Sequence, residues 1–389
     1  PVIVFINDPL KFTAEPKVET RHDSFDIGQY SWFRGAVANF IEALVRKNSI
    51  ELSVGIMNTT QAILADLIEH DPDPSEESEK EYGPDAQNMD YVSYCINCNR
   101  GKAMHALIQH ALRRARMRPE EERKEEEGKG PFPTGKRMDL CKDFLSKRLS
   151  EEKSPSVQSA YGQFLPYLFY LDQEWAINLR QQDKLFPAKE ERNRFWEGHW
   201  QGYIGYGDFY DQIYCLLYKD YLKATERLSI KHSTSAEEKV FIGERHNRHD
   251  DRLAEHLMIA YWRKKAEITD NDGILNMFFK KASVILRGHA ISFLANAIKD
   301  VKPQKNSEEW KRLHALWEYR VEKVNDQELA SFARWLKYCP EELSSVIHLI
   351  KPAIPYLYMG YQEECLVDYI DSQIEVDTLN ALILLNELF

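Results

Sequence analysis

Two groups of side chains in the sequence are of the types that bind metal ions, and the first surrounds a CxxC pair. Cys95 and Cys98 form that pair, and His105 and His110 follow it. Zinc takes four nitrogen or sulfur ligands in a tetrahedron, and a CxxC pair supplies two of them. The two histidines are five residues apart, so on a helix they point to different sides. The pattern therefore favours two buried thiols over a zinc site.

The second group is His246, His249 and Asp250, with His256 further along the chain. Imidazole and carboxylate groups could hold a metal ion or supply a general base here. They suggest an alternative function, that of a metal-dependent hydrolase or nuclease. The flanking residues are strongly polar and are typical of a solvated loop that enters a helix. We favour that interpretation, and we expect neither a bound metal nor a cofactor.

Sequence motifs of common enzyme classes are absent from the chain. It contains no GxxxxGK[ST], no GxSxG and no HExxH sequence. These patterns mark phosphate-binding loops, serine hydrolases and zinc proteases, respectively. We therefore expect that this chain is not itself an enzyme.

A cluster of basic residues could contact phosphate or a partner protein. It consists of Arg113, Arg114 and Arg116, but the acidic stretch 120–127 follows directly, which favours a salt-bridged and solvated face. The chain carries 51 Lys and Arg against 62 Asp and Glu, a net charge of −11, which argues against a nucleic-acid partner. A nucleic-acid-binding helical array stays open as an alternative, and the three arginines are also candidates for binding a protein.

Tyrosines recur in an aromatic stretch over residues 195–221. They are three or four residues apart, so a continuous helix would place them in one stripe. Such a stripe usually packs against the next helix. If it is exposed it is a binding surface, because tyrosine offers a large contact area at low entropic cost. The candidate partner-binding residues are Tyr203, Tyr206, Tyr210 and Tyr214.

The sequence that must position these groups contains a repeated motif, Arg-Gly-x-Ala-x-x-x-Leu. It begins once at Arg100-Gly101 and again at Arg287-Gly288, and a looser third copy begins at Ser156. The small residues let a neighbouring helix approach closely, and the leucine fills the shared core. Helical pairs that cannot bury their apolar faces alone are typical of an α-solenoid. We call the two Arg-Gly pairs the first and the second corner.

Composition and periodicity predict an all-α fold, an α-solenoid of HEAT/TPR-like helical pairs. Hydrophobic residues make up 43% and charged residues 29% of the chain, a globular balance. Almost no alternating strand pattern follows residue 10. We expect an irregular lead-in over 1–30, helical repeats over 31–117, a charged linker over 118–137 and a helical-repeat array over 138–389.

The sequence contains no signal peptide and no apolar run long enough to cross a membrane. Six cysteines lie mostly in apolar helical sequence, which is typical of reduced thiols. We therefore expect a cytoplasmic location and no membrane partner. The chain also begins and ends in apolar runs, 2–6 and 381–389, which suggests a piece of a longer polypeptide.

Four segments, residues 96–116, 156–175, 250–262 and 284–298, together resemble part of a known family. They are similar to the C-terminal helical arrays of large bacterial anti-phage defence proteins, the STAND-type NTPases and their sirtuin-linked relatives. In that family the array is a sensor that binds a phage structural or packaging protein. Binding assembles the NTPase and releases an N-terminal effector.

The resemblance implies that this chain is a recognition region without catalytic residues of its own. It also implies that the chain oligomerises through a parent protein. The nucleotide-binding signature of the family is missing from this sequence. The resemblance therefore places that signature upstream, in a longer protein.

Overall fold

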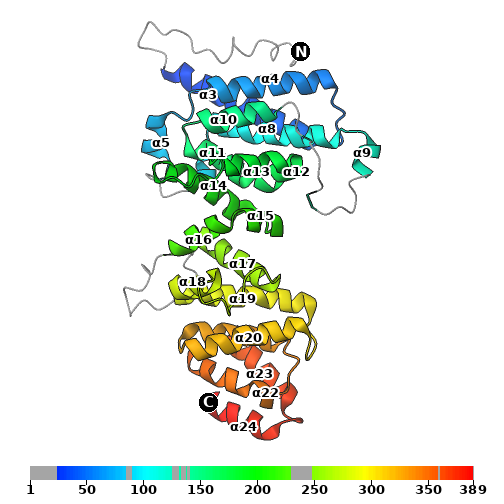
Figure 1. Ribbon diagram of the computed structural model, residues 1–389, viewed down its shortest axis with the longest axis vertical. Helices are drawn as coiled ribbons and strands as arrows, with labels where there is room; N and C mark the ends of the chain where they lie inside the picture. Colours follow the sequence, from blue (N-terminus) through cyan, green and yellow to red (C-terminus); the bar gives the residue numbers. More distant parts are fainter. Residues whose placement is uncertain are drawn as a thin grey trace. The chain divides into compact units, whose positions relative to one another are not determined.

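The computed structural model describes residues 24–84, 90–124, 131–132, 137, 141–228, 248–357 and 360–388, with backbone alone over 24–30. Within these ranges every regular element is a helix, which confirms the predicted all-α fold (Figure 1). The chain divides into two compact units, Pro1–Asp208 (unit 1) and Phe209–Phe389 (unit 2). That division falls inside the single array expected over 138–389. Among the helices described, none has the length and apolarity needed to span a bilayer.

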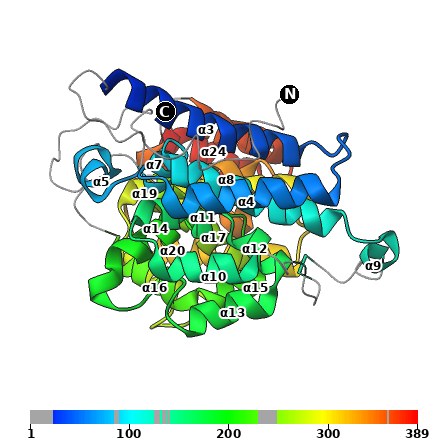
Figure 2. The ribbon, with the colours of Figure 1, turned by 90° about the horizontal axis from the view of Figure 1, so that it is seen from above.

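Unit 1 is organised around helix α8, which packs between α3 and α4 and also contacts α7, α11 and α12 (Figure 2). Because neighbours lie on several sides, α8 buries polar residues such as His105 and His110 together with its apolar ones. The helices of unit 1 are α3 (Ser24–Arg46), α4 (Val54–His70), α5 (Glu76–Tyr82), α7 (Tyr91–Cys95), α8 (Asn99–Arg116), α9 (Glu120–Lys124), α10 (Lys142–Glu151), α11 (Pro155–Gln163), α12 (Leu165–Leu171), α13 (Gln173–Gln181), η1 (Glu190–Arg192) and α14 (Asn193–Tyr206).

Helices α11 and α14 cross at very close range in unit 1. A Cβ added at Gly162 would overlap the carbonyl of His199, and one added at Gly202 would overlap the carbonyl of Ser159. Only a residue without a side chain allows two helix backbones to approach so closely. The looser third copy of the motif lies in α11 and its Ser159 takes part in this crossing, but the two glycines that allow it were not among the residues that define the copy.

Unit 2 has α19 at its centre, packed against α17 and η3. An aromatic cluster completes the core: the ring of Trp317 stacks on Phe332 at 5.3 Å between centroids, and Trp335 meets Phe332 edge-on at 4.8 Å. The helices of unit 2 are α15 (Asp211–Leu216), α16 (Tyr218–Glu226), α17 (Arg248–Trp262), α18 (Ile274–Lys281), α19 (Val284–Val301), α20 (Glu308–Lys323), η3 (Gln327–Phe332), α21 (Ala333–Leu336), α22 (Leu343–Ile350), η4 (Lys351–Tyr356), α23 (Tyr361–Gln373) and α24 (Thr378–Leu388).

Helix starts in both units follow ordinary capping chemistry. Ser154 accepts a hydrogen bond from the Val157 amide at 3.1 Å, and Ser307 accepts one from the Trp310 amide at 3.2 Å. Asp326 begins η3 by accepting the Glu328 amide at 3.0 Å. Free amides in a first turn need such acceptors, which is why the sequence marks these starts with Ser and Asp.

Candidate functional site

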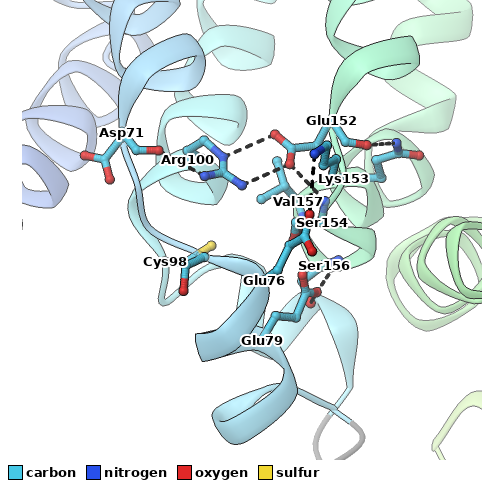
Figure 3. Close-up of polar contacts among 12 residues, drawn as sticks. Asp71, Glu76, Glu79, Cys98, Arg100, Glu152, Lys153, Ser154, Ser156 and Val157 are labelled. Atoms are coloured by element: carbon cyan, nitrogen blue, oxygen red, sulfur yellow. Dashed lines mark hydrogen bonds and ion pairs between the residues drawn. The ribbon is translucent and has the colours of Figure 1, made fainter.

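The first corner is built on a buried ion pair. Arg100 donates from Nε and Nη2 to the two carboxylate oxygens of Glu152, at 3.2 and 3.0 Å (Figure 3). Its Nη1 donates to the carbonyl oxygen of Asp71 at 2.9 Å. Asp71 is the C-cap of α4 and Glu152 is the C-cap of α10. One guanidinium therefore ties the start of α8 to the ends of two other helices.

The side chain of Glu152 is only 1% exposed, and both of its carboxylate oxygens accept hydrogen bonds. It accepts a second arginine, Arg148, at 3.2 Å, and the amide of Ser154 at 2.9 Å. A buried carboxylate is tolerated when charged donors surround it in this way. Glu79 from α5 supplies another carboxylate nearby, accepting from the amide of Ser156 at 3.0 Å and from its hydroxyl at 2.5 Å (Figure 3).

The second corner repeats this arrangement in unit 2. Arg287 donates from Nε to Glu328 and from Nη2 to Asp326 at 2.6 Å. Its Nη1 donates to the carbonyl of Ala282, the C-cap of α18, at 2.8 Å. Glu328 is completely buried and accepts a second arginine, Arg320, at 2.6 Å. Each corner thus joins a helix C-cap, an arginine and a buried glutamate that binds two arginines.

The two corners differ in the chain that precedes them. Arg100 follows its bridged carbonyl, Asp71, by 29 residues, whereas Arg287 follows Ala282 by five. The additional residues of unit 1 contain α5 and α7, and we call this stretch, residues 72–98, the insert. The same arginine-based frame therefore exists with and without an inserted pair of helices.

In unit 1 the insert covers the corner glycine. A Cβ added at Gly101 would overlap the carbonyl oxygen of Cys95, the last residue of α7. Cys95 is completely buried, and burial raises the pKa of its thiol to about 12. The space beside the first corner is therefore closed by the chain itself.

In unit 2 the glycine of the corner lines an open cavity of about 280 Å³. A Cβ added at Gly288 would approach only the Ser331 hydroxyl closely, at 2.8 Å. No carboxylate lines the cavity among the side chains that the structure describes. The lining residues come from α19, η3, α21 and α23, and are Val284, Ile285, Gly288, His289, Ser292, Gln327, Ala330, Ser331, Arg334 and Gln362.

Three of these side chains define the polarity of the cavity. Arg334 is exposed and its guanidinium lies over the ring of Tyr361, 5.2 Å from the centroid. The Oε1 atom of Gln362 is buried and has no hydrogen-bond partner in the described part of the chain. His289 pairs through Nε2 with Glu255 at 3.2 Å, and this hydrogen bond raises the pKa of the imidazole above 6.5 although burial opposes it.

The four tyrosines proposed from the sequence do not form one stripe, and this prediction is wrong. Helix α14 ends at Tyr206, the chain then runs through an extended Gly207, and Tyr210 is the N-cap of the next helix. Tyr203 and Tyr214 are buried at 0% and 2% exposure, and pack in the cores of unit 1 and unit 2. Tyr206 and Tyr210 retain exposed surface, so these two alone stay candidates for contact with a partner.

The arginine cluster is engaged inside unit 1. Arg113 is 7% exposed and donates to the Asn48 side chain at 2.8 Å and to the Ile50 carbonyl at 2.6 Å. Arg114 donates to Asn58 at 2.5 Å, and Arg116 to the carbonyl of Val45 at 3.5 Å. These cations anchor the end of α3 and the segment that leads into α4, where unpaired carbonyls attract positive charge. Because these guanidinium groups are used inside unit 1, the cluster is a poorer candidate for binding phosphate or a partner protein.

The histidine candidates are only partly covered by the structure. His246 lies outside the described residues, while His249 and Asp250 are half-buried in the first turn of α17. Nowhere in the described ranges do three or more His, Cys, Asp or Glu side chains gather as a metal site would require. The metal-dependent alternative gains no geometric support from these positions.

The CxxC histidines diverge as their spacing predicts. His105 Nε2 lies 3.8 Å from the sulfur of Cys95, whereas His110 Nε2 lies 2.8 Å from the carbonyl oxygen of Met57 on α4. Burial lowers the pKa of each imidazole to about 4. Both histidines are therefore neutral core residues near neutral pH.

Comparisons with known proteins find no relative. No protein-family model matches the chain, no curated protein is similar in sequence, and no solved structure is similar in fold. The two corners are therefore the features from which a function is inferred.

Proposed function

We propose that this chain is a non-catalytic helical recognition region that binds a protein partner, the sensor part of a bacterial antiviral defence protein. The observation that carries the proposal is the open cavity beside the second corner. Unit 1 fills the place beside its corner glycine with its own α7, whereas beside the second corner the described residues leave a cavity open.

The frame around the cavity suits recognition. Arg287, Glu328 and Arg320 hold α19, η3 and α20 together through buried ionic hydrogen bonds. Side chains on such rigid elements keep their positions and lose little entropy when a partner binds. This frame thus presents the hydroxyls of Ser292 and Ser331 in a fixed arrangement.

The polar groups that line the cavity favour part of a protein over a largely apolar cofactor. Small-molecule and cofactor sites usually enclose about 300–1,000 Å³ of largely apolar space. This cavity of about 280 Å³ lies at the lower edge of that range, and besides aliphatic side chains it is lined by amides, hydroxyls, an imidazole and one guanidinium. A short segment of a partner could seat its side chains here while the neighbouring surface of unit 2 contributes the remaining contacts.

The similarity of four segments to the sensor arrays of anti-phage proteins supports a phage structural or packaging protein as that partner. In such a system, assembly and effector activity would belong to a parent protein. The chain itself would supply only the recognition step, which is consistent with the absence of common catalytic motifs from its sequence.

The proposal is tested by capture. The tagged chain is co-expressed with individual phage structural and packaging proteins, and bound protein is recovered by affinity. Ser292→Trp fills the cavity, whereas Lys219→Trp adds the same side chain at an exposed position on α16 that does not line it. We expect one phage protein to be captured by the wild type and by Lys219→Trp, and lost with Ser292→Trp.

Two results would overturn the proposal. Capture that survives in Ser292→Trp would exclude the open corner as the binding site. If folded wild-type chain captures none of the phage proteins, the proposed class of partner is wrong. Circular dichroism on each variant distinguishes lost binding from lost folding.

A further inference from the structure

Resting on the proposed function, we infer that the open second corner binds an acidic helical segment of the partner, with a carboxylate on Arg334 and the end of the helix against Gly288. The inference names the chemistry of the segment that the proposed recognition region selects. It rests on a comparison of what lies beside each corner.

The first corner provides an internal template for the bound segment. Beside Gly101 lies the C-terminal end of α7, with the carbonyl of Cys95 in direct contact with the glycine. From the same insert, Glu79 places its carboxylate on the hydroxyl and amide of Ser156. A helix end and a carboxylate therefore fit beside this arginine-based frame when the chain supplies them itself.

The charge of the cavity selects an acidic segment. The chain has more acidic than basic residues, 62 against 51, yet none of the described residues that line the cavity is acidic. Arg334 is exposed there, and Lys337, also exposed, follows one turn later. A guanidinium binds a carboxylate through two parallel hydrogen bonds, and the Tyr361 ring beneath Arg334 helps hold the guanidinium plane in place.

A buried acceptor in the cavity is matched by the backbone of such a segment. Gln362 Oε1 is shielded from solvent and lacks a hydrogen bond within the described structure. A buried polar atom without a partner is unfavourable, so a bound donor would stabilise it. Within a helix only the N–H groups of the first turn are free, so one of these or a serine hydroxyl of the partner provides that donor, whereas a simple anion provides none.

Because Gly288 has no side chain, the part of the cavity that it lines has room for the end of a helix. A side chain at this position would meet the Ser331 hydroxyl and extend into the space above it. At Gly101 the equivalent absence of a side chain lets the Cys95 carbonyl approach. At Gly288 the nearest backbone atom is 3.9 Å from an added Cβ, so the glycine leaves room there for backbone of a partner.

The test uses fluorescent alanine-based peptides of about 15 residues, a length at which such helices begin to form in water. One peptide carries glutamates spaced four residues apart, a second carries glutamines instead, and a third carries the glutamates with a central proline. Anisotropy titrations with the whole chain should show that the helical glutamate peptide binds at least about tenfold more tightly than either of the others, with added salt weakening it.

Variants locate the effect in the cavity. Arg334→Gln and Ser292→Trp should each remove the preference for glutamate, whereas Lys219→Gln, which removes one exposed positive charge elsewhere in unit 2, should retain it. Equal binding of the glutamate and glutamine peptides, or a preference that survives Arg334→Gln, would overturn the inference.

The outcomes separate this inference from the proposed function. If a phage protein is captured through the cavity but the peptides show no preference, the recognition function stands and the acidic helix is wrong. If the glutamate peptide binds through Arg334 but no phage protein is captured, the chemistry of the corner stands and the proposed partner is wrong.

Discussion

Unit 1 and unit 2 each contain an arginine that bridges a helix C-cap and a buried glutamate. The glycine that follows this arginine has different surroundings in the two units. In unit 1 the insert brings α7 against Gly101. In unit 2 Arg287 follows Ala282 by five positions, and Gly288 faces a cavity. The ionic frame therefore does not depend on whether the neighbouring space is filled.

The motif therefore involves two separate properties, the joining of helices and the availability of a binding surface. The arginine and glutamate determine how the helices are joined, and the segment beside the glycine determines whether a surface is available. A sequence search for the motif alone would treat both corners as equivalent. Only the length of the preceding connection, 29 residues against five, distinguishes the closed corner from the open one.

The largest effects are expected from removing the buried carboxylates. Glu152→Ala leaves Arg100 and Arg148 without their shared partner, and Glu328→Ala does the same to Arg287 and Arg320. Each change should lower the free energy of unfolding by about 3–5 kcal/mol, because two arginines lose the buried carboxylate that they share, although Arg287 keeps Asp326 and Arg148 keeps Glu151. Urea unfolding followed by circular dichroism measures both. A loss below about 1 kcal/mol in either variant would show that the two frames are not equivalent.

The corner glycines should respond unequally to alanine. At Gly101 the new methyl group overlaps the backbone carbonyl of Cys95, and overpacking of this kind costs about 1–3 kcal/mol or more. At Gly288 the methyl group meets a hydroxyl that can rotate away, and alanine is the better helix former by about 1 kcal/mol. Thermal unfolding should therefore show a clear loss for Gly101→Ala and little change for Gly288→Ala. Equal losses would mean that the second corner is closed too.

A smaller, pH-dependent effect is expected at the edge of the open corner. The hydrogen bond with Glu255 raises the pKa of His289, so its contribution is present below pH 6.5 and is lost as pH rises through the higher folded value. Burial would raise the pKa of Glu255, but hydrogen bonds from His289 and Arg252 outweigh it and lower that pKa below 4.5. The pair therefore stabilises unit 2 most between these limits.

His289→Gln tests this effect. The variant should be less stable than the wild type by up to about 1 kcal/mol near pH 5.5. The difference should shrink near pH 8.5, because the wild-type imidazole loses its proton as the pH rises through its raised pKa. Unfolding curves at the two pH values provide the comparison, and a difference that grows with pH would contradict the assigned ion pair.

Local patterns in the sequence predicted the corners but not their partners. Ala103, Leu107, Ala290 and Leu294 are all buried as their helical spacing indicated. Glu152 and Glu328 lie 52 and 41 residues after their arginines, at ends of helices that share no motif, so no periodicity connects them. The sequence also did not indicate that the insert closes the first corner, because this depends on where α7 packs.

Two surface predictions failed for the same reason. The tyrosine stripe assumed that one helix continues through Gly207, whereas α14 ends at Tyr206. The arginine cluster looked solvated because acids follow it in sequence, whereas Arg113 is buried against the loop between α3 and α4. The end of a helix decides the first case and a tertiary contact decides the second. Neither can be deduced from the spacing of residues in the sequence.

Thiol labelling at matched positions compares the accessibility of the two corners. Ser292 and His105 each lie four residues after the glycine of their corner, and Cys215→Ser removes the exposed native thiol. In that background the account predicts fast labelling of Ser292→Cys, slowed at least about tenfold by the helical glutamate peptide, and slow labelling of His105→Cys throughout. An unreactive thiol at position 292, or a labelling rate that the bound peptide leaves unchanged, would contradict it.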